Sequence, residues 1–219
     1  MIRLLVFDFD GVLVDSNAVK QNAYREVLKE VPNGLPALAE AQKRFPEADR
    51  FGILKETFLL VKGPHANVEA DVRRAARRYN TICEEFTATC AEISGVSSVL
   101  PELLDSYNLA INSDTPQTPL QRVVIKRGWN TWFSHVLGRP KTKEENFSSL
   151  FQAHHVSAQQ TVFLGDRERD RKAAINTKCL FVGMKNAFNN FQRQPQYMVS
   201  DLKAFKELIC SARFEVARV

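Results

Sequence analysis

The sequence lacks the features that mark membrane, secreted and low-complexity proteins. No apolar run approaches the ~20 residues that a membrane-spanning helix needs, and residues 1–7 meet Asp8 too soon to form the apolar core of a signal peptide. Only 9 glycines and 9 prolines occur in 219 residues, which argues against a low-complexity chain. The 4 cysteines are scattered, with neither a Cys-x-x-Cys pair nor zinc-type spacing. These absences predict a cytoplasmic globular protein with reduced thiols.

The sequence also lacks a large excess of positive or of negative charge. Lys and Arg number 30 against 25 Asp and Glu, so the net charge is a mildly basic +5. The basic cluster within residues 73–78 is flanked by acidic residues and has no accompanying aromatic pattern, which is typical of a solvated helix face. We therefore expect neither a nucleic-acid partner nor a membrane partner. The length allows one or two domains, and the sequence carries no signal for an oligomeric state.

Short apolar runs separated by helical stretches set the expected fold. Ile2–Phe9 is almost continuously apolar, and shorter runs of the same kind cover residues 109–112, 161–164 and 180–182. Strands that alternate with helices predict an α/β protein with a doubly wound, mainly parallel, Rossmann-like sheet. In such sheets the functional side chains lie just beyond the carboxyl ends of the strands.

Residues 16–91 differ from the rest of the chain because they contain no convincing strand. Asn17–Val31 and Asn67–Phe86 instead carry apolar residues at helical spacing. We therefore predict a helical domain, residues 16–91, inserted after the first strand of an α/β core formed by residues 1–15 and 92–219.

The first predicted strand ends in two carboxylates, Asp8 and Asp10, followed by Gly11. Side chains two residues apart on a regular strand point the same way, and two like charges placed together need a cation or a shared proton. One aspartate can attack an electrophile while the other handles protons, and both offer oxygen to Mg²⁺. A solvated strand end is the alternative, which the aliphatic run before Asp8 disfavours.

Three more polar segments follow predicted strands, and each has a plain structural alternative. Residues 113–116 (Ser-Asp-Thr-Pro) could form a phosphate cradle or a helix cap. Residues 138–143 (Gly-Arg-Pro-Lys-Thr-Lys) could supply a phosphate-neutralising lysine or a solvated basic loop. Asp166 and Asp170 suit a hard divalent cation or an exposed turn. The order of the four segments is more informative than any one of them.

This order resembles the haloacid dehalogenase-like superfamily, in the branch of phosphoglycolate phosphatase and β-phosphoglucomutase. Residues 8–16 (Asp-Phe-Asp-Gly-Val-Leu-Val-Asp-Ser) match its first motif closely, Ser113 falls on the second, and Gly165-Asp166 with Asp170 on the fourth. Residues 16–91 fall where these proteins carry an inserted cap, so the resemblance covers nearly the whole chain. The local third-motif pattern Gly-x-Pro-x-x-Lys favours Lys143, whereas the spacing back from Gly165 selects Lys141.

The resemblance implies a phosphatase: a Mg²⁺-dependent phosphomonoester hydrolase that acts on a small phosphorylated metabolite through an aspartyl-phosphate. Asp8 would be the nucleophile and Asp10 the general acid and base. The implied catalytic set is Asp8, Asp10, Ser113 and Lys143. The implied metal ligands are Asp8, Asp10 through its backbone carbonyl, Asp166 and Asp170. The substrate-binding candidates are Ser113, Asp114, Lys143 and Arg50.

Several alternatives stay open at this stage. Arg50, from the helical stretch, is explained at least as well by a solvated helix face. Arg167 departs from the family pattern, which more often has a small residue there, and this change is expected to affect solvent access or phosphate contacts. A phosphosugar mutase would use the same motifs, and a catalytically weak member that binds a metabolite or a protein is a third possibility.

Overall fold

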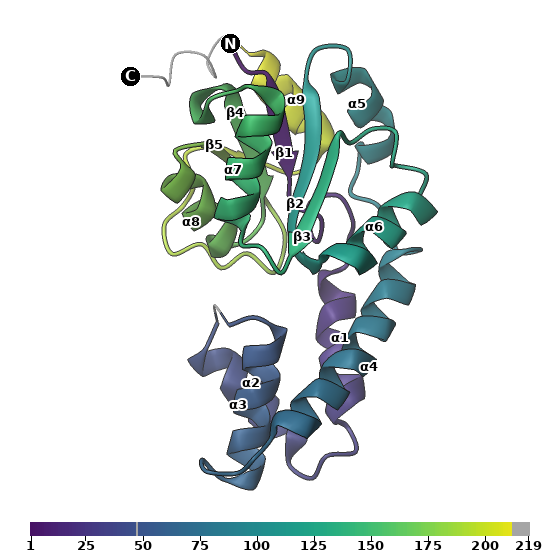
Figure 1. The fold of residues 1–219 in the computed structure, drawn as a ribbon, viewed down its shortest axis with the longest axis vertical. Helices are drawn as coiled ribbons and strands as arrows, with labels where there is room; N and C mark the ends of the chain where they lie inside the picture. The colour runs from purple at the N-terminus through teal and green to yellow at the C-terminus, as the bar shows by residue number, and fades with distance from the viewer. Residues whose placement is uncertain (47, 212–219) are drawn as a thin grey trace. The chain divides into compact units, whose positions relative to one another are not determined.

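The computed structural model describes residues 1–46 and 48–211, which form two compact units (Figure 1). Among the described residues, the core unit contains Met1–Ser16 and residues 88–211, and the helical unit lies within Asn17–Thr87. For comparison, the sequence placed the two boundaries after residues 15 and 91.

The core unit is built on one six-stranded sheet. Its strands are β1 (Leu4–Phe7), β2 (Asn108–Pro116), β3 (His135–Arg139), β4 (Thr161–Gly165), β5 (Leu180–Met184) and β6 (Met198–Val199). They lie in the order β3-β2-β1-β4-β5-β6, and every neighbouring pair is parallel. This confirms the predicted doubly wound α/β fold. The chain winds from β1 toward one edge and from β4 toward the other, so the topological switch point lies between β1 and β4.

Alternation along the strands divides the apolar side chains between the two faces of the sheet. Leu5 and Phe7 of β1 belong to one buried cluster, and Leu4 and Val6 belong to another. Both faces are therefore apolar, as expected for a parallel sheet covered on each side. This double burial explains why the central strands were visible as continuous apolar runs.

Helices cover both faces of this sheet (Figure 1). The cluster of Leu5 and Phe7 includes residues of α5 (Val96–Leu103), α6 (Gln117–Lys126) and α9 (Leu202–Cys210). The opposite cluster includes residues of α7 (Lys143–His154) and α8 (Glu168–Thr177). The short 3₁₀ helix η1 (Ala158–Gln160) leads directly into β4. Strands β3 and β6 were not predicted, because β3 mixes polar and apolar residues and β6 has only two residues.

The helical unit has its own apolar core and four helices in its described residues. These helices are α1 (Asn17–Leu28), α2 (Gly34–Arg44), α3 (Arg50–Lys62) and α4 (Glu69–Thr87). The helices predicted over 17–31 and 67–86 are confirmed, and α1 ends three residues before its predicted end. At Gly34 a side chain would approach the Leu28 carbonyl oxygen to 2.7 Å, so glycine permits the tight connection from α1 to α2.

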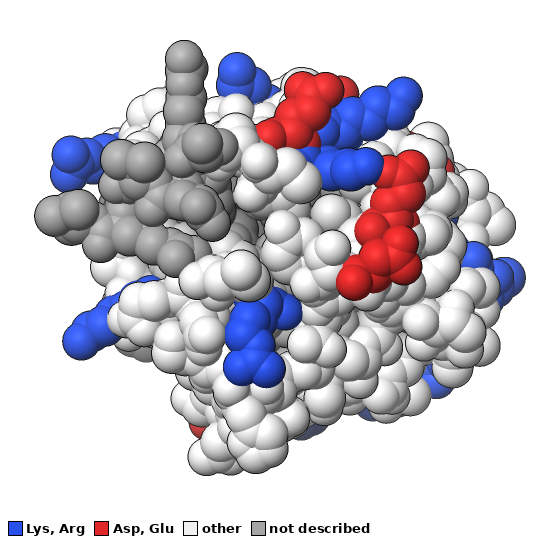
Figure 2. Space-filling view, turned by 90° about the horizontal axis from the view of Figure 1, so that it is seen from above, with Lys and Arg blue, Asp and Glu red and all other residues white. Residues whose placement is uncertain are grey.

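Charges at the molecular surface are mixed rather than segregated. On the face drawn in Figure 2, blue basic side chains are scattered and several lie beside red acidic ones. On α4, Arg74 pairs with Asp71 at 2.8 Å and both belong to its solvent-facing side. Among residues 1–46 and 48–211, no helix combines the length and apolar character needed to cross a bilayer.

Candidate functional site

Two aspartates follow the two strands that flank the switch point. Asp8 comes directly after β1 and Asp166 directly after β4, and these strands are paired in register up to Phe7 and Leu164. The Asp8 backbone N–H also donates to the Leu164 carbonyl at 2.9 Å. The sheet therefore brings together side chains that are 158 positions apart in the sequence.

Asp170 joins this pair from the first turn of α8. Oxygens of Asp8, Asp166 and Asp170 lie within 4.8 Å of one another, and all three side chains are buried. Glycine at position 165 makes this approach possible, because a Cβ there would lie 2.4 Å from the Cβ of Asp170. The Gly-Asp pattern of the sequence thus has a direct steric reason.

Lys143 is the cation that the structure places among these carboxylates. Its Nζ lies 3.0 Å from Oδ1 of Asp8 and 2.7 Å from Oδ1 of Asp170. Lys143 is 4% exposed and is the one buried cation among the described residues. Lys141 is exposed, and its Nζ lies 3.4 Å from the Ser149 hydroxyl. Of the two candidate lysines, the structure brings Lys143 to the aspartates.

Burial and neighbouring charge shift the pKa values at this site in opposite directions. Burial, opposed by Lys143, raises the pKa of Asp8 to about 6, and burial also raises the pKa of Asp170. Burial alone would lower the pKa of Lys143, but the carboxylates of Asp170 and Asp8 outweigh it and hold that pKa above its usual value. The lysine is therefore a permanent cation, whereas Asp8 holds a proton more tightly than a solvated carboxyl does.

A buried asparagine in the middle of β2 fixes the position of Lys143. The Asn112 carbonyl accepts from Lys143 Nζ at 3.1 Å, and the Asn112 side-chain amide donates to the Lys143 carbonyl at 2.9 Å. Asn146, one turn into α7, donates to Oδ1 of Asn112 at 3.0 Å. The sequence analysis missed this link, although a polar residue at the end of an apolar run was a usable signal.

Asp10 lies outside the three-carboxylate cluster and is held by two hydroxyl groups. Ser16 Oγ donates to Oδ1 of Asp10 at 2.5 Å, and Thr115 Oγ1 donates to Oδ2 at 2.8 Å. Gly11, which follows, has a φ of 77°, in the left-handed region that favours glycine. The chain therefore turns sharply after Asp10 while the carboxylate keeps a fixed orientation. Thr115 and Ser16 were also missed as supporting residues.

The carboxyl-terminal part of β2 carries a buried hydroxyl and a paired carboxylate. Ser113 is 2% exposed, and its Oγ accepts from the Thr115 N–H at 3.2 Å. Asp114 is bridged by Arg139 at 3.1 Å and by Arg169 at 2.8 Å. Burial raises the pKa of Asp114, but Lys143 and the two arginines outweigh it and hold that pKa low. Asp114 thus joins the second, third and fourth motif segments as an anion.

The loop after β5 packs its asparagines against Asp166. Asn186 donates to Oδ2 of Asp166 at 2.8 Å, and Asn189 donates to the Asp166 backbone carbonyl at 2.8 Å. Arg167 turns toward the same loop, where its Nη1 donates to the Phe188 carbonyl at 2.7 Å. The unusual arginine therefore anchors the loop, a role that the local motif could not reveal.

Arg50 belongs to the helical unit and begins α3. Its guanidinium donates to Oδ1 of Asn80 and lies 5.5 Å from the centre of the Tyr79 ring. These contacts support a structural role within that unit, and its contact with substrate stays a prediction.

The three-carboxylate cluster has the donor chemistry that Mg²⁺ requires. Magnesium prefers hard oxygen ligands, and Asp8, Asp166 and Asp170 supply only carboxylate oxygens from a buried position. Their three negative charges exceed the two positive charges nearby, those of Lys143 and of Arg167, whose Nε lies 3.5 Å from Oδ2 of Asp166. Asp170 already has partners at both carboxylate oxygens. Its Oδ2 accepts from the N–H groups of Asp166 and Arg167, and its Oδ1 faces Lys143. The residues present therefore fit a divalent cation.

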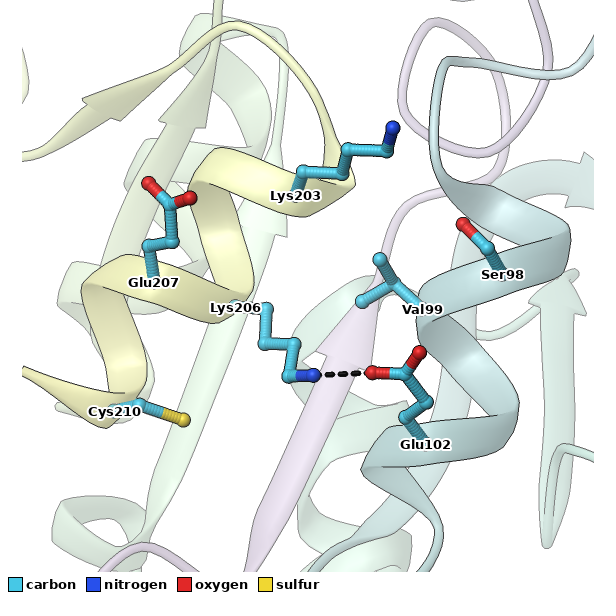
Figure 3. A pocket seen from close by; sticks show the side chains of 7 residues that line it. All are labelled: Ser98, Val99, Glu102, Lys203, Lys206, Glu207 and Cys210. Carbon is cyan, nitrogen blue, oxygen red and sulfur yellow. Dashed lines mark hydrogen bonds and ion pairs between the residues drawn. The ribbon is translucent and has the colours of Figure 1, made fainter.

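The core unit also has a surface cavity, which lies outside the carboxylate cluster. It measures about 500 Å³ and lies between α5 and α9, where Lys206 pairs with Glu102 (Figure 3). Its lining includes none of the residues predicted for the site. This cavity is thus separate from the carboxylate cluster.

Comparison with known families gives a match over most of the chain. The family model described as haloacid dehalogenase-like hydrolase matches residues 5–184. A phosphoglycolate phosphatase from Vibrio cholerae is 26% identical over 222 residues, covering 95% of this chain and 97% of that protein. A pyrophosphatase from Listeria monocytogenes is 25% identical over 220 residues, with coverage of 93% and 95%. The family resemblance drawn from the motifs is thereby confirmed.

Solved structures agree on the fold. A structure described as a predicted phosphoglycolate phosphatase from Haemophilus somnus superposes with a TM-score of 0.76 at 19% identity, covering 95% of this chain and 98% of that one. A β-phosphoglucomutase from Clostridium difficile gives a TM-score of 0.75 at 16% identity, covering 100% of both chains. At these identities the likeness establishes the fold alone.

Proposed function

We propose, because the chain belongs to the haloacid dehalogenase-like hydrolase family, that it is a Mg²⁺-dependent phosphomonoester hydrolase acting on a small phosphorylated metabolite. The observation that carries this proposal is the placement of Lys143 against Asp8 and Asp170, with Asp166 beside them at the switch point of the sheet. The names of the phosphatase relatives support the same reaction class.

Asp8 is the nucleophile in this proposal. Its carboxylate attacks phosphorus in line, which forms an aspartyl-phosphate as the bond to the leaving oxygen breaks. Lys143, fixed by Asn112, orients this carboxylate and supplies a permanent positive charge for the phosphoryl oxygens. Ser113 adds a buried hydroxyl as a hydrogen-bond donor to the same oxygens.

Asp10 moves the protons. It first gives a proton to the leaving oxygen and then takes one from the water that attacks phosphorus, which releases phosphate and restores Asp8. The hydroxyls of Ser16 and Thr115 support this role because they hold the carboxylate in one orientation. A carboxylate held in this way loses little conformational freedom in the transition state.

The carboxylates of Asp8 and Asp166 would hold Mg²⁺, together with the backbone carbonyl of Asp10, and Asp170 would act directly or through water. The chemistry that bound Mg²⁺ supplies is charge neutralisation between the anionic nucleophile and the anionic phosphate. Asn186, which donates to Oδ2 of Asp166, supports the proposal because it holds this carboxylate in place.

The helical unit is proposed as a cap that excludes water and recognises the substrate. Arg50 is its candidate for contact with an anionic substrate. We expect Arg50→Gln to raise KM for phosphorylated metabolites by roughly tenfold, which is the loss of about one charged hydrogen bond. Turnover of acetyl phosphate, which lacks the recognised part of a larger substrate, should change little.

The direct test is phosphate release from a panel of sugar phosphates, phosphoglycolate, nucleotides and acetyl phosphate, with Mg²⁺ or with EDTA. Release that requires Mg²⁺ and disappears in Asp8→Asn is the expected result. Asp105→Asn is the matched control, because Asp105 is an exposed acid of the same unit, outside the site. If no compound in the panel yields phosphate from folded protein, the hydrolase proposal is wrong.

The same panel separates hydrolysis from phosphosugar transfer. A mutase returns the phosphoryl group to its substrate, so it produces an isomer and little free phosphate. Product analysis by NMR, with a sugar bisphosphate added to prime the enzyme, would show isomer accumulation in that case.

A further inference from the structure

Two histidines lie close together where β3 begins and α7 ends, at the opposite end of α7 from Lys143. His135 is the first residue of β3 and His154 the last of α7, and both rings are partly buried. Nδ1 of His135 lies 3.1 Å from Nε2 of His154, and Ser134 Oγ lies 3.0 Å from that same Nε2. Two polar atoms, one from the first residue of β3 and one from the residue before it, therefore contact the same nitrogen of α7.

Nε2 of His154 carries at most one proton, so it cannot donate a full hydrogen bond to both Ser134 and His135. The Ser134 hydroxyl already donates its single hydrogen to the Leu109 carbonyl at 2.8 Å, so it turns a lone pair toward His154. Nε2 of His154 then has to share one proton between Ser134 and a lone pair on His135. Without that proton, Nε2 of His154 offers a lone pair and lies within 3.1 Å of two further electron-pair donors, and three donors this close together suit one shared cation.

This arrangement does not suit a serine nucleophile. A relay needs the hydroxyl on one ring nitrogen and an orienting group on the other. Here both contacts fall on the same nitrogen of His154.

We propose that His135, His154 and Ser134 form a second metal site, selective for a divalent transition metal that prefers imidazole, such as Zn²⁺. Imidazole nitrogens suit zinc, copper and nickel, whereas Mg²⁺ prefers oxygen. With Zn–N bonds of about 2.05 Å, nitrogens 3.1 Å apart subtend roughly 100° at the metal, which is close to tetrahedral. Ser134 and water complete the coordination.

The protonation state of His154 supports binding at neutral pH. Partial burial and the neighbouring His135 lower the pKa of His154, so this ring is neutral and able to act as a ligand. The site is also independent of the carboxylates, because the eleven-residue step from Lys143 to His154 spans roughly 16 Å along α7. Its effect is to tie the first residue of β3 to the last turn of α7.

The test is proton NMR of the imidazole Hε1 signals during a Zn²⁺ titration in excess Mg²⁺. The chain has 4 histidines, so each signal can be assigned with one variant. We expect the signals of His135 and His154 to shift together and saturate near one equivalent, while those of His65 and His155 stay in place. Four signals that shift in parallel, or none that shift, would overturn the proposal.

His154→Gln and His155→Gln make a matched pair for a second readout. Saturating Zn²⁺ should raise the melting temperature of the wild type and of His155→Gln by a few degrees, as expected for a ligand that binds only the folded state. His154→Gln should show no such rise, with its metal-free melting temperature as the check on folding. An equal rise in both variants contradicts the proposed ligands.

Discussion

The two units of this protein treat charge in opposite ways. The core unit buries the charged side chains of Asp8, Asp10, Lys143, Asp166, Glu168 and Asp170. In the described part of the helical unit, Thr57, Thr87 and Asn17 are the buried polar residues, and no charged side chain is buried. Its ion pairs, such as Arg74 with Asp71, lie on the surface.

This difference is informative because buried charge is costly. Removing an ion from water costs several kcal/mol even after the protein relaxes, and a well-packed apolar side chain would often be more stable. The described part of the helical unit buries an apolar core and no charged side chain. Most of the buried charges of the core unit gather beyond the ends of β1 and β4, and we propose that they serve chemistry rather than stability.

The largest expected effect follows from removing the nucleophile. Asp8→Asn should reduce kcat by roughly 10³-fold or more, as loss of a nucleophile does in other enzymes. The metal-free melting temperature should stay the same or rise, because burial already raises the pKa of Asp8 and so disfavours its ionised form. Calorimetry beside a turnover assay checks both parts, and a strong loss of stability would mean that the charge is structural.

Removing the buried cation should instead damage both stability and activity. Lys143→Gln leaves Asp8 and Asp170 without their ion-pair partner and should cost about 3–5 kcal/mol of unfolding free energy. The matched control is Lys141→Gln, because that exposed lysine should change the unfolding free energy by less than about 0.5 kcal/mol. Urea unfolding of both variants measures the difference, and equal losses would refute the assignment of Lys143.

The raised pKa of Asp8 predicts a pH-dependent metal site. Below about pH 6 a proton on Asp8 competes with Mg²⁺, so affinity should rise roughly tenfold between pH 5 and pH 7. The unfolding free energy of metal-free protein should fall as pH rises from about 4 to about 6, since the folded state holds a proton that the unfolded chain releases. Titration calorimetry measures the first trend, and Asp8→Asn, which cannot titrate, should abolish it.

The smallest effect is expected on the surface of the helical unit. Arg74→Gln removes an exposed ion pair and should change the unfolding free energy by less than about 1 kcal/mol. Leu54→Ala, in the apolar core of the same unit, should cost about 2–5 kcal/mol. Thermal unfolding ranks the two variants, and a large loss in Arg74→Gln would break the contrast between the units.

Local pattern predicted the parts of the fold whose signals are local. The apolar runs of β1, β2, β4 and β5 are continuous because both faces of the sheet are covered, and motif residues follow the runs of β1, β2 and β4. Strand β3 escaped prediction because an edge strand of mixed composition has no such run. Helices α2 and α3 lie within the predicted helical domain, residues 16–91, but the sequence analysis gave neither of them its own bounds.

The supporting contacts of the site could not be predicted in the same way. Asn112 and Lys143 are 31 positions apart, and Asn186 and Asp166 are 20 apart, so only the folded chain shows that they meet. Sequence spacing left Lys141 and Lys143 open, and the geometry of α7 brings Lys143 to Asp8. The phosphoryl-transfer roles of these residues stay predictions until they are measured.

The central claim is that Asp8 becomes phosphorylated during turnover. Mixing enzyme, Mg²⁺ and a turned-over substrate, quenching in acid within milliseconds, and measuring the mass of the peptide that contains Asp8 tests this most directly. The predicted result is one added phosphoryl group on that peptide, which is absent in Asp8→Asn and in EDTA. Turnover without any phosphorylated peptide, at quench times shorter than one catalytic cycle, would contradict the claim.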